Sequence, residues 1–418
     1  MALPSCLEQG LRAALEKRRH EGQYWGLPLH NEQKNCIDFN TNDSLSLVTS
    51  GALRTELLQE LSKNLDANIG SGACRLNGGS TDYMVDLEKM LANVHNTEDA
   101  LSQLGDAIVY DSLVHASVHD GIKQSRASIA KYFTHNDLSD LAKLLDAVKS
   151  VSPIIQTGKR TVFIAIESFY SLDGDMAPLD AFIQVAQKSL PQGNYVFTID
   201  EAHSNGVVGL NGAGFVSALG LEKHFTLRLQ TCGKALGSVG AIVLCSPLVK
   251  EMFINYARNF IYTTAPPLLN LVTVKSAYKI LASADGQQRI ERLQHNIRYF
   301  FETLHQHPDW PTVAESGRIR LRLALNWQKA PFLTPIVPLI TKPERCLALK
   351  GFLEQQGFAT IALQHPIVSR SGERVRVVIH AHNTQAEINS LVDAIMQWGK
   401  EEETSISGSR KRAAQPML

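Results

Sequence analysis

Lys234 lies in a run of small residues, "TCGKALGSVG" at 231–240, directly after the alternating apolar run "FTLRLQ". A lysine is rarely fully buried unless it is paired, and the surrounding glycines and serine offer little side chain to pair with it. A phosphate-binding Walker loop is excluded, because that pattern needs Ser or Thr after the lysine and this chain has alanine there. A desolvated amine is partly neutral and can form a Schiff base with a carbonyl compound. The residue types therefore predict covalent chemistry at Lys234.

A second polar group follows the apolar run "NYVFTID", which continues directly into "EAHSNGVVG". Asp200 and His203 would then lie at the carboxyl end of a parallel strand, where open α/β sheets bind ligands. A buried aspartate is costly unless it meets a cation, which could be Lys234 or the protonated ring nitrogen of a pyridine cofactor. Pyridoxal phosphate fits the second alternative, because it needs a lysine, an acid opposite its ring nitrogen and anchors for its phosphate. Taken alone, Asp200 would more often be a helix N-cap.

Alternating strands and helices would position these groups. The runs "DAIVY", "TVFIAIES", "NYVFTID", "FTLRLQ" and "GAIVLCS" are separated by helical or glycine-rich segments, which predicts a mostly parallel sheet with helices on its faces. After about residue 270 the pattern changes to a long helical stretch and then to "RIRLRLAL", "TPIVPLI" and "ERVRVVIHA", which alternate with period two. We expect these to be strands of an α+β domain with one solvated face, followed by a last helix, "AEINSLVDAIMQW".

These patterns divide the chain into four parts. The expected parts are an N-terminal helix and arm over 1–45, a large domain over 46–270, a small α+β domain over 271–400 and a disordered polar tail over 401–418. In the first part, Leu7, Leu11 and Leu15 recur at helical spacing, as in a docking helix.

Composition excludes several classes of protein. The 418 residues include 41 basic and 41 acidic ones, so no overall charge favours nucleic acid or an anionic membrane. No apolar run approaches the length of a membrane span, and the N-terminus lacks the apolar segment of a secretory signal. The six cysteines form no C-x-x-C pair, which favours a reducing compartment. We expect a cytoplasmic protein, with a peroxisomal location as an alternative because Leu418 follows a basic cluster as in a weak C-terminal signal.

Several motifs in order resemble the α-oxoamine synthases, a family of pyridoxal-phosphate enzymes. They are "VYDSLVHASVHDGIKQSRA", "ESFYSLDGDMAPL", "DEAHSNGVVG", "TCGKALGSVGA", "FIYTTAPP" and "ERVRVVIHAHNT". The resemblance covers about residues 8–400 and is strongest to the branch that makes 8-amino-7-oxononanoate in biotin synthesis. It implies the aminotransferase-like fold of type I pyridoxal-phosphate transferases, with a large-domain sheet of the seven-stranded type, and a homodimer with shared active sites.

The resemblance also implies a role for each matching residue. Lys234 would carry the cofactor and move the substrate's α-proton, Asp200 would face the pyridinium nitrogen and His203 the phenolic oxygen, and His115 would stack on the ring. The other matches are Ser168 and Thr231 near the cofactor, Thr231 being the phosphate ligand; Thr263 and Thr264, donated across the dimer interface; and Asn42 and Arg376, which would bind substrate. Arg376 would hold the amino-acid carboxylate through its guanidinium fork.

Most of these residues also have an ordinary structural interpretation. His115 alone would more often be a structural histidine, and the Thr263–Thr264 pair could be ordinary strand residues. Arg374 and Arg376 alternate with valines, so a solvated strand face is possible for both, and for Arg374 we predict it.

His380 and His382 could suggest a metal pair. Two ligands without a suitably spaced cysteine or carboxylate make a weak site, and we expect no metal.

The implied reaction is the decarboxylative condensation of an amino acid with an acyl-CoA to give an α-aminoketone, with L-alanine and pimeloyl-CoA as substrates of the named branch. Two alternatives remain. One is a relative that uses serine or glycine in sphingoid-base or secondary metabolism. The other is a catalytically impaired subunit that dimerises with an active homologue, which the presence of Lys234 disfavours.

The sequence departs from the family pattern in two ways. Ser44, Cys74, Gln364 and Ile367 replace residues usual on the substrate side, which affects the choice of substrate. The chain also passes from "TEDAL" through "SQL" to "GDAIVYD" without the strand, turn and helix that the family has there, and residues 101–105 are too few for a crossover. We therefore expect a helix N-terminus that would bind the cofactor phosphate to be missing, through an incomplete gene model, a splice form or degeneration.

Overall fold

The computed structural model describes residues 4–20, 24, 35–95, 106–321 and 327–400. The chain forms two units, residues 1–37 and 38–418. In the first, helix α1 (Ser5–His20) confirms the expected N-terminal helix, and Leu7, Leu11 and Leu15 are exposed on it. The segment 96–105, where the crossover is expected to be missing, and the tail 401–418 lie outside the described residues.

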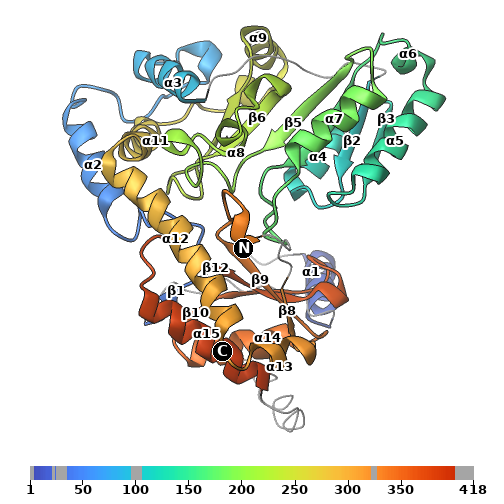
Figure 1. Cartoon of the computed structure of the whole chain (residues 1–418). Coiled ribbons are helices and arrows are strands. Elements are labelled where there is room, and N and C mark those ends of the chain that lie inside the picture. Colours follow the sequence, from blue (N-terminus) through green and yellow to red (C-terminus); the bar gives the residue numbers. More distant parts are fainter. Residues whose placement is uncertain (1–3, 21–23, 25–34, 96–105, 322–326, 401–418) are drawn as a thin grey trace. The chain divides into compact units, whose positions relative to one another are not determined.

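The second unit contains a six-stranded sheet with the order β3-β2-β4-β5-β6-β7 (Figure 1). Its strands are β2 (Ala107–Asp111), β3 (Ile129–Phe133), β4 (Val162–Glu167), β5 (Tyr195–Asp200), β6 (Phe225–Thr231) and β7 (Ala241–Leu244). Neighbouring strands from β3 to β6 are parallel, and β7 is antiparallel to β6. This confirms the mostly parallel sheet, with six strands among the described residues where the family type has seven.

Five of these six strands were expected from their apolar runs, and β3 was not. Its sequence, "IAKYF", carries a lysine, and only Phe133 of the strand is buried. A strand at the edge of a sheet has one neighbour and needs few apolar residues, so its hydrophobic pattern is weak.

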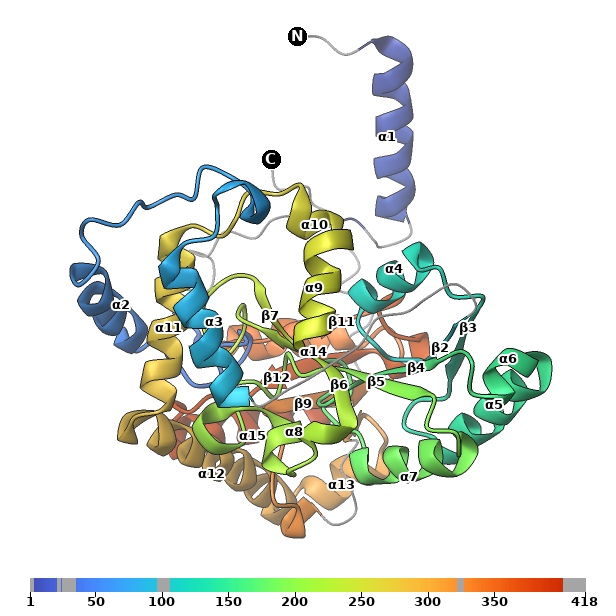
Figure 2. The ribbon, with the colours of Figure 1, turned by 90° about the horizontal axis from the view of Figure 1, so that it is seen from above.

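Helices cover the large sheet. They are α2 (Ala52–Ser62), α3 (Asp82–His95), α4 (Ala116–Gln124), α5 (Leu138–Val151), α6 (Pro153–Gln156), α7 (Leu179–Ser189), α8 (Phe215–Ala218), α9 (Pro247–Tyr256), α10 (Arg258–Ile261) and α11 (Leu268–Leu281). Helices α5 and α7 pack together near β2 and β3, while α2, α3 and α11 gather beyond the other end of the sheet (Figure 2). The inner strands β2 and β4 are therefore buried on both faces, as expected for an α/β sheet, whereas β3 at the edge is mostly exposed.

A smaller antiparallel sheet follows, with the order β11-β12-β9-β8. Its strands are β8 (Ile319–Arg320), β9 (Ile336–Thr341), β11 (Ile361–Leu363) and β12 (Arg374–Val378). The neighbouring elements are the short strands β1 (Ile37–Asp38) and β10 (Phe358–Ala359) and the helices α12 (Ala284–Gln306), α13 (Trp310–Glu315), α14 (Cys346–Gln355) and α15 (Gln385–Lys400). The α+β region and its last helix are confirmed.

The expectation that these strands have one solvated face is wrong for β9 and β12. All six residues of β9 are buried, and four of the five in β12. Helix α14 packs against β12, and the turn Phe169–Met176, which follows β4, contacts both strands. The sheet is covered from two sides because a turn of the larger sheet lies against it.

Part of the expected N-terminal arm is built into the second unit. The Phe39 N–H donates to the Ala359 carbonyl (3.1 Å), and the Ala381 N–H donates to the Ser44 carbonyl (2.8 Å). Phe39 is fully buried. This segment therefore belongs to the core beside the small sheet. No described helix is both long and apolar enough to cross a membrane.

Candidate active site

Three neighbouring strands end at one edge of the large sheet and bring three charged groups together. Glu167 is the last residue of β4 and lies in register with Asp200, the last residue of β5. Strand β6 ends at Thr231 and leads into the loop that contains Lys234. Parallel strands end at the same edge, so residues 67 positions apart in sequence become neighbours there.

Lys234 is half-buried in this loop. Burial lowers the pKa of its amine to about 8, although the charges of Asp200 and Glu167 act in the opposite direction; Arg376 lowers it further. An amine with this pKa is partly neutral near pH 7, as Schiff-base chemistry requires. The structure thus gives Lys234 the environment that its small neighbours predicted.

Asp200 and Glu167 are both buried carboxyl groups. Burial raises the pKa of Asp200, and burial together with the charge of Asp200 raises the pKa of Glu167 to about 8. The Asp200 Oδ1 accepts the Ala202 N–H (2.8 Å), so this carboxylate caps the turn that follows the strand. No helix begins at this point, so Asp200 is not a helix N-cap.

Sequence reasoning missed Glu167. Its Oε1 accepts the His115 backbone N–H at 2.5 Å, which ties the start of α4 to the end of β4. The available signal was its place at the end of the buried run "TVFIAIES", the same position that Asp200 has in the next strand. Only the register of β4 against β5 makes the two carboxyl groups neighbours.

The other residues expected near a cofactor, His203, His115 and Ser168, differ in burial and in their contacts. His203 is buried, and burial together with the charge of Lys234 lowers its pKa well below the ordinary value. His115 is exposed and caps α4, its Nδ1 accepting the Ser117 N–H (3.3 Å). Ser168 is fully buried; its hydroxyl lies 3.2 Å from the Asp200 carbonyl and 2.9 Å from the Ser204 hydroxyl.

Thr231 closes the Lys234 loop. Its Oγ1 donates to the Gly240 carbonyl (3.4 Å) and accepts the Gly233 N–H (3.4 Å).

The expected Thr263–Thr264 pair lies on an exposed segment. Thr264 pairs with Cys74 in an isolated antiparallel bridge, and it lines an open cavity of about 470 Å³ together with Val239 and Gly240. Asn42 is half-buried, in the segment that is hydrogen-bonded to residues 380–383.

Of the two arginines of β12, Arg374 differs from the expectation and Arg376 is placed as a substrate residue could be. Arg374 is buried and forms an ion pair with Asp173, so the predicted solvated strand position is wrong. The physical reason is that the turn Phe169–Met176 covers this strand and supplies the counter-charge. Arg376 is half-buried, and its Nη1 donates to the Ser171 carbonyl (3.4 Å). Its Nε is buried and has no hydrogen-bond partner among the described residues, which suits a guanidinium that binds an anion.

His380 and His382 belong to separate contacts. His380 Nε2 lies 2.9 Å from the Thr41 carbonyl, and His382 Nε2 accepts from Arg289 Nη1 (3.2 Å). No group of three or more metal-ligating side chains occurs in the part of the chain that the structure describes.

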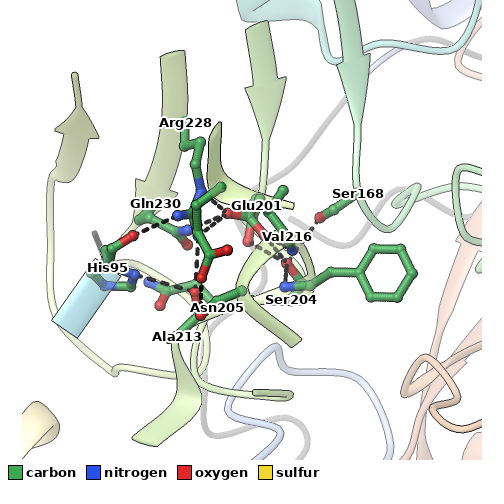
Figure 3. A network of polar contacts seen from close by, with 12 residues as sticks. His95, Ser168, Glu201, Ser204, Asn205, Ala213, Val216, Arg228 and Gln230 are labelled. Atoms are coloured by element: carbon green, nitrogen blue, oxygen red, sulfur yellow. Dashed lines mark hydrogen bonds and ion pairs between the residues drawn. The ribbon is translucent and has the colours of Figure 1, made fainter. Parts of the chain in front are cut away.

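A buried polar network surrounds Glu201, the residue after Asp200 (Figure 3). Glu201, next to Asp200, forms an ion pair with Arg228 of β6 (2.8 Å), and both side chains are fully buried. Its two oxygens also accept the Val216 N–H (2.9 Å) and the Gln230 amide (2.5 Å). Arg228 in turn donates to the carbonyls of His95 (2.6 Å) and Ala213 (3.1 Å). The network fixes the loop after β5 to β6 and to the end of α3.

His135 joins the ends of β2 and β3 to the turn after β4. Its Nδ1 lies 2.9 Å from Asp111 Oδ1 and its Nε2 lies 2.8 Å from Asp175 Oδ2. The two carboxylates outweigh burial and raise the pKa of His135 to about 10. The ring of Tyr170 packs edge-on against the imidazole at 4.4 Å. His135 is therefore an imidazolium at neutral pH and holds two acidic segments together.

Comparison with known proteins identifies the family. The model for aminotransferase class I and II matches residues 90–395. The chain is 37% identical to the 8-amino-7-oxononanoate synthase of Emericella nidulans, over 94% of this chain and 96% of that one. The chain belongs to the α-oxoamine synthase family of pyridoxal-phosphate enzymes. It is also 36% identical to the aminoacyl transferase sphA of Aspergillus fumigatus, over 91% of this chain and 85% of that one.

Solved structures support the fold. The serine palmitoyltransferase of S. paucimobilis with a bound PLP–myriocin aldimine superposes with a TM-score of 0.73 and 22% identity, covering 93% of this chain and 96% of that one. Together with the six-stranded sheet and the small antiparallel sheet, this confirms the type I transferase fold.

The residues at the sheet edge fit the cofactor of this family. A pyridine ring needs an acid for its nitrogen and an amine for its aldehyde, and Asp200 and Lys234 provide these at adjacent strand ends. Arg376, whose Nε has no hydrogen-bond partner among the described residues, is near enough for its charge to lower the pKa of the same lysine, which suits a carboxylate-bearing substrate beside the ring.

We predict that Glu201→Gln will lower the free energy of unfolding by about 3–5 kcal/mol, because it leaves the Arg228 charge buried without a counter-charge. Urea unfolding measures this. The control is Asp309→Asn, which removes an exposed pair with Lys400 and should cost at most about 1 kcal/mol. A loss below 1 kcal/mol for Glu201→Gln would contradict this account of the network.

The charge on His135 predicts a pH dependence of stability. Since its pKa is raised from 6.5 to about 10 in the fold, its contribution is complete below pH 6.5 and is lost as the pH rises towards 10. The difference in unfolding free energy between the natural protein and His135→Gln should therefore be largest near pH 6 and should shrink by up to about 1.4 kcal/mol per pH unit above that. Urea unfolding at pH 6, 8 and 9.5 gives the difference. A constant difference would show that His135 is neutral in the fold.

Proposed function

We propose that this chain condenses L-alanine with pimeloyl-CoA, releasing carbon dioxide and coenzyme A and forming an α-aminoketone, as in biotin synthesis. An α-oxoamine synthase reaction follows from the family. The observation that carries the chemistry is the half-buried Lys234, with its lowered pKa, facing the strand-end Asp200. The choice of substrates is supported by the Emericella nidulans relative, which is named 8-amino-7-oxononanoate synthase and matches over nearly its whole length.

Lys234, Asp200 and His203 have separate chemical roles in the proposed reaction. Bound pyridoxal phosphate supplies an electron sink for the carbanion at the amino acid's α-carbon. Lys234 holds the cofactor and then removes the α-proton as a general base, for which a pKa of about 8 is suitable. Asp200 would pair with the ring nitrogen, where its carboxylate would keep the ring protonated. Because His203 is buried and its pKa is lowered, it would meet the ring's phenolic oxygen as a neutral group.

The remaining contacts concern orientation. His115 would stack on the ring, and its backbone N–H is held by the Glu167 carboxyl. Arg376 takes the amino-acid carboxylate with its unpartnered guanidinium edge, and Asn42 contacts the substrate from the neighbouring segment. Ser168 and Thr231 would lie next to the cofactor; Ser168 orients the Asp200 backbone and Thr231 the Lys234 loop.

A second candidate is the use of serine or glycine with another acyl-CoA. The observation that favours it is the 36% identity to the aminoacyl transferase sphA. Ser44, Cys74, Gln364 and Ile367, the four departures from the usual pattern, are consistent with either candidate. A catalytically impaired subunit remains the third alternative.

We predict that purified protein with saturating pyridoxal phosphate changes its absorption spectrum most strongly with L-alanine. The coupled release of coenzyme A should show a kcat/KM at least tenfold higher for L-alanine with pimeloyl-CoA than for L-serine with palmitoyl-CoA. Saturating cofactor is used because the expected missing crossover near 101–105 would remove a phosphate site and weaken binding. The matched control is Lys234→Ala, which should abolish turnover and the covalent label that borohydride leaves on the Lys234 peptide.

The reverse preference, for serine and a long acyl chain, would favour the second candidate. No turnover with any amino acid, together with borohydride labelling at Lys234, would favour an impaired subunit.

We also propose that the protein is a homodimer with shared sites. Helix α9 buries only Val249, while Leu248 and Tyr256 on it are exposed, so it carries an apolar surface that no described residue of this chain covers. Thr263 and Thr264 follow this helix on an exposed segment. A surface of this kind is typical of a subunit interface. If a second copy of the chain binds to this surface, Thr263 and Thr264 of the first copy would reach the active site of the second.

Sedimentation equilibrium should give twice the chain mass of 46.1 kDa. The double variant Leu248→Glu, Tyr256→Glu places two negative charges in the apolar surface of α9. It should be monomeric and have lower turnover, because burying unpaired charges in an interface is costly. The matched control is Leu347→Glu, a similarly exposed leucine on α14, which should leave the mass unchanged. A monomeric natural protein with full turnover would contradict the shared site.

A further inference from the structure

Two arginines of the small sheet contact the turn Phe169–Met176. An antiparallel bridge between Phe169 and Met176 closes this turn, which follows the site strand β4. Arg374 of β12 donates through Nη1 to the Leu172 carbonyl (2.8 Å) and forms an ion pair with the Asp173 carboxylate. The exposed fractions of these two charged side chains are 5% and 2%, so the pair is closed to water.

Arg376 lies two residues further along β12, so its side chain leaves the strand on the same face as that of Arg374. Its Nη1 donates to the Ser171 carbonyl (3.4 Å). Two arginines spaced two residues apart on the strand therefore contact three consecutive residues of the turn. The contact of Arg374 is charged and buried, whereas that of Arg376 is a single long hydrogen bond.

The turn is also fixed on its other sides. Gly174 has φ +62°, and a Cβ at this position would lie 2.2 Å from the Ile336 carbonyl oxygen, so only glycine allows the turn to approach β9 this closely. The Thr334 hydroxyl donates to the Gly174 carbonyl (2.9 Å). At the next residue Asp175 meets the charged His135 (2.8 Å). A turn held in this way can place the Ser171 carbonyl accurately for Arg376.

Asp173 also affects the charge beside Arg376. Without its carboxylate, Arg374 would present a second uncompensated guanidinium next to the one that is free to bind an anion. With the pair intact, Arg374 is neutralised and hydrogen-bonded, since its Nε also donates to the Gly372 carbonyl (2.7 Å). Arg376 is then the guanidinium available to a carboxylate at this place.

We propose that Asp173 and Arg374 are positioning residues for Arg376: the buried pair fixes the turn that orients Arg376 and leaves a single guanidinium to bind the amino-acid carboxylate. This inference rests on the proposed function, in which Arg376 binds that carboxylate. It predicts an effect on amino-acid binding and not on the chemistry at Lys234, which lies on a different loop.

The test compares Asp173→Asn with the natural protein at saturating cofactor. We expect the KM for the amino acid to rise at least tenfold and kcat to stay within threefold, with a parallel rise in the dissociation constant measured by spectral titration with the amino acid. Asp173→Glu restores the charge and should recover part of the loss. The matched control is Glu373→Gln, which changes another buried carboxyl group just before β12 that accepts the Glu344 N–H (2.7 Å) and has no contact with the turn among the described residues. The KM of the Glu373→Gln variant for the amino acid should be unchanged, even if the free energy of unfolding of this variant falls.

A double-mutant cycle separates positioning from general damage. Arg376→Ala alone should raise the KM, and Asp173→Asn added to it should raise the KM no further. If Arg376→Ala leaves the KM unchanged, the carboxylate assignment of the proposed function fails. If Arg376→Ala raises the KM and Asp173→Asn does not, or if the two effects multiply, the positioning proposal alone is overturned. Thermal unfolding of the cofactor-free variants shows whether each one is folded.

Discussion

The buried ion pair of Glu201 and Arg228 is the contact on which the candidate site depends. Glu201 directly follows Asp200, and Arg228 lies on β6, three residues before Thr231 and the Lys234 loop. Neither charge can be left alone in the interior, because an unpaired buried ion costs several kcal/mol. The loop after β5 is therefore confined to the arrangement that satisfies both charges.

The rest of the network extends this constraint. The pair's hydrogen bonds reach the carbonyls of His95 at the end of α3 and of Ala213 in the loop before α8. His95 is neutral, since burial and the neighbouring Arg228 lower its pKa, and its Nε2 lies 2.7 Å from the Tyr278 hydroxyl of α11. A buried polar network of this kind specifies one arrangement of its elements because every alternative leaves groups unsatisfied. Here the elements it joins include β5, which ends at Asp200, and β6, which leads into the Lys234 loop.

A second set of charges joins the large sheet to the small one. His135 links the ends of β2 and β3 to Asp175, and Arg374 links β12 to Asp173 in the same turn. The turn thus carries two acidic residues, and each meets a cation from a different sheet. This arrangement explains why β12 is buried although its sequence alternates arginine with valine. It also explains how Arg376 of the small sheet is held near Lys234, at the carboxyl edge of the large one.

The sequence by itself determined the local features: five of the six described strands of the large sheet, the first and last helices, and the desolvated setting of Lys234 in its run of small residues. Asp200 at a strand end followed from the rule that parallel sheets bind ligands at their carboxyl edge. The tertiary structure alone decided which distant groups meet. Glu167 lies beside Asp200 because of the register between β4 and β5, and His135 is charged because Asp111 and Asp175 approach it from separate elements. Arg374 is buried because a turn 201 residues earlier supplies Asp173. Local patterns cannot reveal these pairs, since the free energy that fixes a buried charge comes from its partner, and the fold chooses the partner.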